Sequence, residues 1–260
     1  MQPASGVFGQ FEVLNALILR EIKTRFGAHQ LGYLWALIEP SLWIGTFVAM
    51  FYLLGRSGPS GMDTVSFIAT GLIPFMLFRE TGIRAVSAIG ANKGLLFYPQ
   101  IQPLDLVFAR VLLEFVTLLT VFAVIIFTAS MLRGTTPRVS DWLLFVSGFA
   151  AAAALGGSLG LLLMGLSVFT PAIERLHGPL LRPLFWFSGI FYTANGLPPV
   201  VRDVMLYNPV LHVVEVVRSG WFIEYRSQHA SLLYVGGWIV SFSFLGLLVE
   251  RAARRRLELS

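Results

Sequence analysis

The chain has 260 residues, of which 56% are hydrophobic and only 13% are charged, and its mean hydropathy is +0.74. Because an ordinary soluble domain is about 25% charged, this composition excludes a soluble globular domain and favours a helical membrane protein in one domain, residues 1–260. The net charge of +5 would also suit nucleic-acid binding. The basic residues lie at the ends of apolar runs, however, where membrane topology and anionic lipid explain them better, so no nucleic-acid partner is expected.

Residues 10–28 predict an amphipathic helix that lies along the membrane surface. Arg20 and Lys23 fall opposite an apolar face, and the segment is too short and too charged to cross the membrane. Glu21 and Arg25 are spaced to form an i,i+4 ion pair. At 100° per residue, the apolar face consists of Phe11, Leu14, Ile18 and Ile22.

Six later segments are apolar enough, over sufficient length, to predict membrane-spanning helices. With both termini on the cytoplasmic side, thirteen of the nineteen Lys and Arg residues lie inside, as the positive-inside rule requires. The predicted fold is therefore all-α with six spans, at 32–55, 64–84, 104–132, 142–169, 176–195 and 231–250.

Three polar or small-residue features within these spans predict specific contacts. Glu39, followed by Pro40, should face protein or water rather than lipid, unless it lies at the membrane surface beside a proline kink. Arg110 and Glu114 are one helical turn apart and either pair with each other or line a polar path. The small-xxx-small pair in the fourth span, Gly156 and Gly160, predicts close approach of a second helix.

The segment 197–226 differs from the spans because its apolar part is short and interrupted. Asn208-Pro209, His212 and Glu215 break it up, so it cannot cross the membrane as one helix. We expect it to enter the membrane from the side opposite the termini and return, as re-entrant half-helices between spans five and six. Irregular backbone at that depth requires a covering of protein or a wet cavity.

Two stretches resemble a known family. Arg25-Phe26-Gly27 and Leu31-Gly32-Tyr33-Leu34-Trp35-Ala36-Leu37-Ile38-Glu39-Pro40 are similar to the start of the first span in ABC-2-type exporter permeases, above all those that export capsular polysaccharide. The second stretch resembles the periplasmic re-entrant region of the same permeases and contains Phe191-Tyr192, Leu197-Pro198-Pro199, Asn208-Pro209, His212, Glu215 and Arg218. The connection 87–101 occupies the place of the family's coupling helix.

The resemblance implies a multi-pass permease subunit of the bacterial inner membrane, with no cofactor or catalysis of its own. It implies a homodimer with two copies of a separate ATPase subunit, which would bind ATP and Mg²⁺. The chain's nearest approach to a phosphate loop ends in Lys93-Gly94, whereas such a loop requires Ser or Thr after Lys. The implied cargo is lipid-linked capsular polysaccharide, passed to periplasmic co-polymerase and outer-membrane export partners.

Three sets of residues are the candidates for this function. Flat rings with polar edges suit a sliding sugar chain, although the same aromatic residues could simply face lipid, and the polar cluster could simply satisfy its own hydrogen bonds. The candidates are, for the ATPase interface, Arg20, Glu21, Lys23, Arg25, Asn92 and Lys93; for the re-entrant polar cluster, Asn208, Pro209, His212, Glu215 and Arg218; and for the conduit lining, Tyr33, Trp35, Glu39, Trp186, Phe187, Phe191 and Tyr192.

Alternative functions remain open at this point. Within the same class, the cargo could be O-antigen or teichoic acid. The G-x-S-x-G spacing around Ser158 could indicate a serine hydrolase, but that motif requires a strand-to-helix turn, whereas Ser158 lies in an apolar helical run. An ion-coupled carrier would need acidic or His residues repeated through several spans. The four His residues lack metal-ligand spacing, so no metal site is expected.

Overall fold

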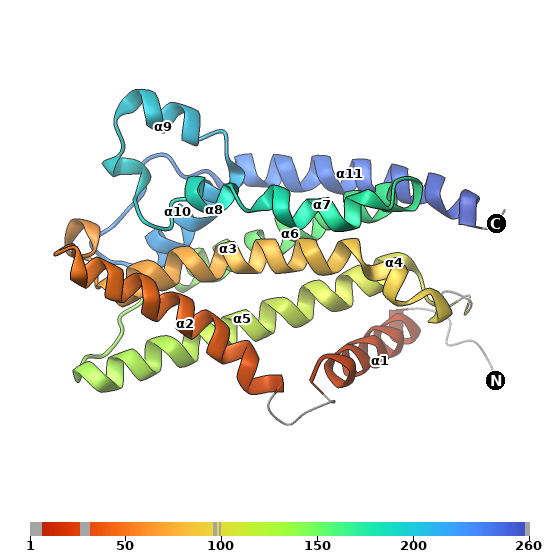
Figure 1. The fold of residues 1–260 in the computed structure, drawn as a ribbon, viewed down its shortest axis with the longest axis horizontal. Helices are drawn as coiled ribbons and strands as arrows, with labels where there is room; N and C mark the ends of the chain where they lie inside the picture. The colour runs from red at the N-terminus through yellow and green to blue at the C-terminus, as the bar shows by residue number, and fades with distance from the viewer. Residues whose placement is uncertain (1–6, 27–31, 96–97, 99, 258–260) are drawn as a thin grey trace.

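The computed structural model describes residues 7–26, 32–95, 98 and 100–257, and these residues form helices and connections without a β-strand. The long helices lie side by side along the longest axis of the molecule (Figure 1). The helices are α1 (Val7–Phe26), α2 (Gly32–Leu53), α3 (Thr64–Val86), α4 (Ala88–Ala91), α5 (Pro103–Arg133), α6 (Trp142–Phe169), α7 (Ala172–Leu181), α8 (Leu184–Phe187), α9 (Pro199–Met205), α10 (Pro209–Trp221) and α11 (Leu232–Leu257).

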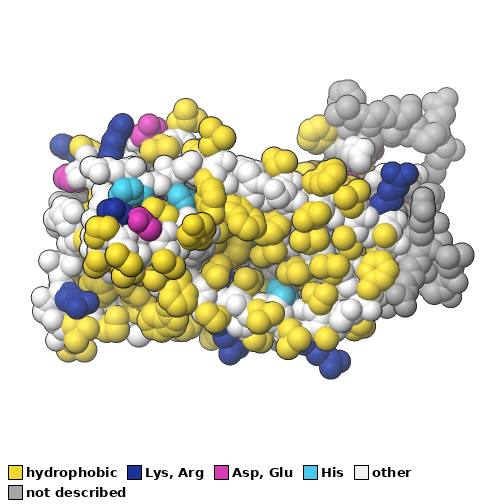
Figure 2. All heavy atoms as spheres, turned by 90° about the horizontal axis from the view of Figure 1, so that it is seen from above, with side chains coloured by type: hydrophobic (Ala, Val, Ile, Leu, Met, Phe, Trp, Pro, Cys, Tyr) yellow, Lys and Arg dark blue, Asp and Glu magenta, His cyan; other side chains and the backbone are white. Residues whose placement is uncertain are grey.

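The molecule has two distinct ends. One end, called here the α4 end, contains α4, α1 and the last turns of α11 (Figure 1). The opposite end, called the α9 end, contains α9 and the connections 54–63 and 134–141. Figure 2 shows one face of the molecule, where hydrophobic side chains cover the middle and charged side chains gather toward the two ends and along one edge.

Within the part of the chain that the structure describes, four helical segments are long and apolar enough to cross a membrane, at Leu34–Leu53, Pro103–Arg133, Trp142–Phe169 and Leu232–Ala253. They coincide with the first, third, fourth and sixth predicted spans. The second predicted span is the long helix α3, whose last two turns carry Arg79, Glu80 and Arg84. The fifth, 176–195, falls on α7, α8 and a non-helical segment after them. That these two regions cross the membrane, and that 197–226 is re-entrant, remain predictions.

Helices α3 and α6 approach each other through glycine, as the spacing of Gly156 and Gly160 predicts. A Cβ atom placed on Gly156 would lie 2.2 Å from the carbonyl oxygen of Phe78, and one on Gly160 would lie 2.4 Å from the Cβ of Ala85. Neither site has room for a side chain, so the two backbones are in contact. Helix α10 joins this pair in the buried core, while α11 packs along α6 with most of its surface exposed.

Helix α1 packs along α5 at the α4 end. Leu14 and Ile18 of the predicted apolar face are partly buried there, but Phe11 is exposed, and the most buried residue is Leu17, which the predicted face omits. The face that contacts the bundle is therefore rotated from the predicted one. Contact of α1 with a membrane surface remains a prediction.

Candidate functional site

A groove lined by aromatic rings lies between α2, α3 and the α7–α8 region. Its volume is about 540 Å³, within the range of about 300–1,000 Å³ typical of ligand sites. We call it the aromatic groove. Its lining consists of Glu39, Trp43, Phe47, Leu72, Phe75, Met76, Arg79, Arg182, Phe185 and Trp186.

Phe185 is the centre of the ring packing in this groove. Its ring centroid lies 5.8 Å from that of Phe47, 5.4 Å from Phe75 and 5.3 Å from Trp186. Tilted and edge-to-face pairs at these separations are favourable and fix the orientation of each ring. The groove wall is therefore a rigid aromatic surface contributed by three separate helices.

Three charged residues, Glu39, Arg79 and Arg182, share the groove with the rings. Arg79 also forms an ion pair with Glu80, with 3.2 Å between Nη1 and Oε1. Glu39 is exposed and lines this groove together with the two arginines, and its position relative to lipid remains a prediction. An aromatic surface with charged groups beside it can hold a sugar chain through ring faces and hydrogen bonds together.

Only some of the predicted conduit residues lie at this groove. Trp186 and Glu39 line it, and Phe191 packs against its wall, 4.7 Å from Phe47 between ring centroids. The hydroxyl of Tyr192 donates a hydrogen bond of 3.3 Å to the carbonyl of Trp186. Trp35 lies exposed on α2, outside the lining.

Phe187 and Tyr33 complete the account of the predicted conduit residues. Phe187 lines a different cleft, beside α10 and α11. The side chain of Tyr33 lies outside the described residues. Sequence reasoning missed Trp43 and Phe47. The spacing 39, 43, 47 places both on the same helical face as Glu39, and this signal could have identified them.

The re-entrant polar cluster centres on Arg218, which is 0% exposed. Its guanidinium donates hydrogen bonds to the carbonyls of Tyr192 (2.7 Å) and Ile190 (3.0 Å) and lies over the ring of Phe67, 4.1 Å from its centroid. The ion pair with Glu215 has 3.5 Å between Nη1 and Oε1. Arg218 therefore holds the non-helical turn after α8 against α10 and α3.

Glu215 is 1% exposed and satisfied from several directions. One carboxylate oxygen accepts the backbone N–H of Ala194 at 3.2 Å, and the other accepts the hydroxyl of Tyr225. Burial, followed by the adjacent Glu215 carboxylate, raises the pKa of Tyr225, so the phenol remains protonated and can donate this hydrogen bond.

His212 and Asn208 attach the start of α10 to its neighbours. The Nδ1 atom of His212 accepts from the backbone N–H of Ser231 (3.1 Å), so Nε2 carries the proton and donates to the carbonyl of Leu206 (2.8 Å). Asn208 caps α10, accepting from the N–H of Val210, and Pro209 occupies the first helical position, where its missing N–H is tolerated. The structure thus brings all five predicted cluster residues to one helix, where they hold α10 in place.

At the α4 end, hydrogen bonds and ion pairs tie α1 to α4 and α5. Arg20 donates a hydrogen bond of 2.7 Å to the side-chain oxygen of Asn92. Glu21 forms an ion pair with Arg110, at 3.2 Å between Oε1 and Nε. Two residues predicted for a partner interface, Arg20 and Asn92, therefore bind each other within the chain.

The remaining interface candidates differ in exposure. Lys23 is exposed on α1, while the side chains of Arg25 and Lys93 lie outside the described residues, so the predicted Glu21–Arg25 pair does too. Glu114, predicted to pair with Arg110 along the same helix, contacts Arg84 on α3 at 2.5 Å. These pairs join neighbouring helices, which sequence spacing alone does not reveal.

Ser158 does not have the environment of a nucleophile. It lies buried in the middle of α6, and its hydroxyl donates to the carbonyl of Leu155, one turn earlier, at 3.0 Å. This is the helical setting expected from the sequence, and it lacks the strand-to-helix turn of a hydrolase.

Comparison with known proteins identifies the family. A family model described as "ABC-2 type transporter" matches residues 12–222, which include the aromatic groove and the polar cluster. The chain belongs to the ABC-2 type transporter family. This family assignment agrees with the resemblance seen in the sequence around Arg25–Pro40 and 191–218.

Individual relatives of this ABC-2 transporter chain cover 82% to 96% of its length. It is 34% identical to the polysialic acid transport protein KpsM of Escherichia coli, over 95% of both chains. It is 30% identical to the capsule polysaccharide export inner-membrane protein CtrC of Neisseria meningitidis, over 82% of this chain and 80% of the relative. It is 28% identical to the capsule polysaccharide export inner-membrane protein BexB of Haemophilus influenzae, over 96% and 94%.

Proposed function

We propose that this chain is the membrane-spanning permease subunit of an ATP-driven exporter that moves lipid-linked capsular polysaccharide across the bacterial inner membrane. The observation that carries the proposal is the aromatic groove, because a rigid wall of rings beside charged groups suits a sugar chain that must be held weakly and keep moving. The names of the relatives, polysialic acid transport for one and capsule polysaccharide export for two, support the same cargo class.

The groove is half of a conduit in this proposal, and a second copy of the chain supplies the other half. Two tryptophans near it, Trp35 and Trp186, are 62% and 61% exposed in the single chain, and Trp43 is also exposed. Large exposed aromatic side chains gathered around one groove favour a protein partner at that surface. A homodimer would enclose the sugar chain between two such walls.

The α4 end is the proposed docking site for a separate ATPase subunit. The contact of Arg20 with Asn92 joins α1 to the connection 87–101, so a force applied to either element is passed to the other. Exposed Lys23 lies on the same helix and is available for an acidic partner surface. ATP and Mg²⁺ would bind to that partner, and closure of the ATPase pair would tilt the bundle and open the conduit.

The proposed topology has six crossings and both termini in the cytoplasm, with 197–226 re-entrant from the periplasm. The α4 end would then face the cytoplasm and the α9 end the periplasm, where co-polymerase and outer-membrane export partners receive the polymer. The grouping of α1, α4 and the last turns of α11 at one end of the bundle supports this arrangement. The topology can be tested by cysteine scanning, because the chain has no native cysteine.

The groove is tested by comparing two tryptophans with similar exposure. Trp186→Ala removes a ring of the groove, while Trp142→Ala removes a ring that is 63% exposed on α6 and outside the groove. Surface polysaccharide is measured in cells that produce equal amounts of each variant in the membrane. We expect the first variant to lose most export and the second to keep it. Equal export by both would refute the groove as the conduit wall.

The ATPase interface is tested by replacing Arg20, Lys23 and Arg25 together with glutamine and measuring co-purification of the ATPase subunit. We expect recruitment to fall at least several-fold while the permease stays in the membrane. Normal recruitment would remove the interface role of α1 and leave the conduit proposal unaffected.

A further inference from the structure

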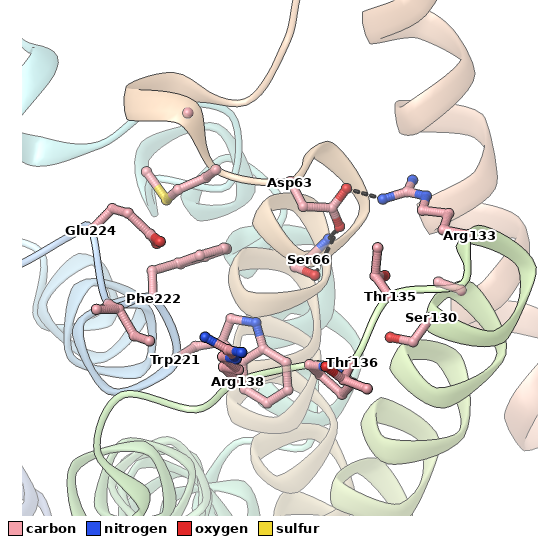
Figure 3. Close-up of a pocket in the computed structure, with 15 residues that line it drawn as sticks. Asp63, Ser66, Ser130, Arg133, Thr135, Thr136, Arg138, Trp221, Phe222 and Glu224 are labelled. Carbon is pink, nitrogen blue, oxygen red and sulfur yellow. Dashed lines mark hydrogen bonds and ion pairs between the residues drawn. The ribbon is translucent and has the colours of Figure 1, made fainter.

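A polar cavity of about 380 Å³ lies at the α9 end, away from the aromatic groove. Figure 3 shows its lining, contributed by the start of α3, the end of α5, the connection after α5 and the end of α10. Its polar residues are Asp63, Ser66, Ser130, Arg133, Thr135, Thr136, Arg138 and Glu224, and buried Trp221 and Phe222 form part of the apolar remainder.

Two of the charged groups in this cavity neutralise each other. Asp63 caps α3 by accepting the backbone N–H and the hydroxyl of Ser66, both at 2.9 Å, and it also forms an ion pair with Arg133. The dashed lines in Figure 3 mark these contacts. Asp63 and Arg133 therefore build the cavity wall and leave little net charge for a ligand.

Arg138 and Glu224 remain for a ligand. Both are exposed, and within the described residues neither forms an ion pair. Figure 3 places them at separate positions around the cavity. The hydroxyls of Ser130, Thr135 and Thr136 lie on the wall near α5, so the cavity offers one cation, one anion and a row of hydroxyl groups.

We propose that this cavity binds an acidic sugar residue of the exported polymer as it leaves the conduit. A guanidinium binds a carboxylate through two parallel hydrogen bonds. The wall hydroxyls and the Glu224 carboxylate suit the ring hydroxyls of the same sugar, since they supply donors and acceptors. The volume is at the low end of the range for ligand sites, which fits one or two sugar residues rather than a longer stretch of polymer.

This proposal rests on the proposed function and deepens it, because it specifies the charge class of the polymer. A neutral polymer would leave Arg138 without a partner. An acidic polymer would receive a weak holding point at the outer end, which opposes backward sliding between transport steps. The site is separate from the groove, so each can be disabled alone.

The test is a ligand titration of the purified full-length chain in lipid nanodiscs, in which binding is measured by saturation-transfer NMR. Three probes separate the contributions: glucuronate carries a carboxylate and hydroxyls, glucose carries hydroxyls alone, and acetate carries a carboxylate alone. We expect glucuronate to bind at least tenfold more tightly than either of the others. Arg138→Gln should weaken glucuronate binding at least tenfold, and Arg138→Lys should weaken it less.

The matched control is Arg56→Gln, an exposed arginine outside the cavity lining, which should leave binding unchanged. Glucuronate binding that is unchanged by Arg138→Gln, or matched by acetate or glucose, would overturn the assignment. If export requires Trp186 but the chain does not bind glucuronate, this site is refuted and the proposed function is not. Surface polysaccharide that persists in cells lacking the chain would refute the proposed function instead.

Discussion

Replacing Arg218 with methionine should destabilise the protein strongly. Within the described residues, Arg218 is the only ion-pair partner of the buried Glu215 carboxylate, and the change removes it. The carbonyls of Ile190 and Tyr192 also lose their guanidinium donor. Removing one partner of a buried pair costs about 3–5 kcal/mol, and each buried unsatisfied carbonyl costs about 1–3 kcal/mol. These terms overlap, so we expect a loss of about 4 kcal/mol or more.

The assay is thermal unfolding of the detergent-solubilised protein, in which the folded fraction is measured by fluorescence-detected size-exclusion chromatography. Arg56→Met is the matched control, since it removes an exposed arginine and should change the stability by less than about 0.5 kcal/mol. The double variant Arg218→Met with Glu215→Gln removes the uncompensated charge and should be more stable than Arg218→Met alone. A midpoint for Arg218→Met within error of the wild type would refute the reasoning.

Two further predictions use the same unfolding assay. Gly156→Ala forces a Cβ into the contact between α3 and α6 and should cost at least about 1–3 kcal/mol. Gly236→Ala on α11 meets nothing within 4 Å and should be neutral or stabilising by up to about 1 kcal/mol, so equal effects would contradict the contact. Glu21→Gln removes the carboxylate that pairs with the mostly buried Arg110 and should lower the stability by about 1–3 kcal/mol. The control Lys23→Gln replaces an exposed side chain on the same helix and should lower it by less than about 0.5 kcal/mol. A larger loss for Lys23→Gln than for Glu21→Gln would contradict the pairing.

The parts of the fold that follow from local pattern could be predicted from the sequence. Long apolar runs predicted α2, α5, α6 and α11, and the spacing of Gly156 and Gly160 predicted close approach of another helix, which the structure shows to be α3. The helix expected over 176–195 is interrupted at Pro183, which has no N–H to continue the helical hydrogen bonds, although Arg182 and Pro183 both keep right-handed helical dihedral angles. Gly189 adds a left-handed turn, with φ of 76°. The high hydrophobicity of this stretch concealed these breaks.

The candidate sites were harder to predict because their contacts join residues far apart in the sequence. The spacing of Glu21 and Arg25 suggested a pair within α1, but the partner that the structure gives Glu21 is Arg110 on α5. The polar cluster was found because its residues interrupt an apolar stretch and match the pattern of the resembled permeases. Its partners, such as the carbonyl of Tyr192, carry no side-chain signal. Backbone acceptors of this kind become visible only once the chain is folded.

Helix α3 connects the three candidate regions, which are the polar cluster, the aromatic groove and the α4 end. Near its start, the ring of Phe67 lies under Arg218 of the polar cluster, and a Cβ on Gly71 would lie 2.8 Å from the Nη2 of that arginine. In its middle, Phe75 forms part of the aromatic groove, and at its end Arg84 contacts Glu114. Because α3 is also in backbone contact with α6, we expect it to move as a rigid body with α6 and α10. Helix α2 has fewer contacts with the bundle. A displacement imposed at the α4 end would then move α3, α6 and α10 together relative to α2, and this movement would change the groove. In the proposed mechanism, the conduit should therefore open at the α2 side of the groove.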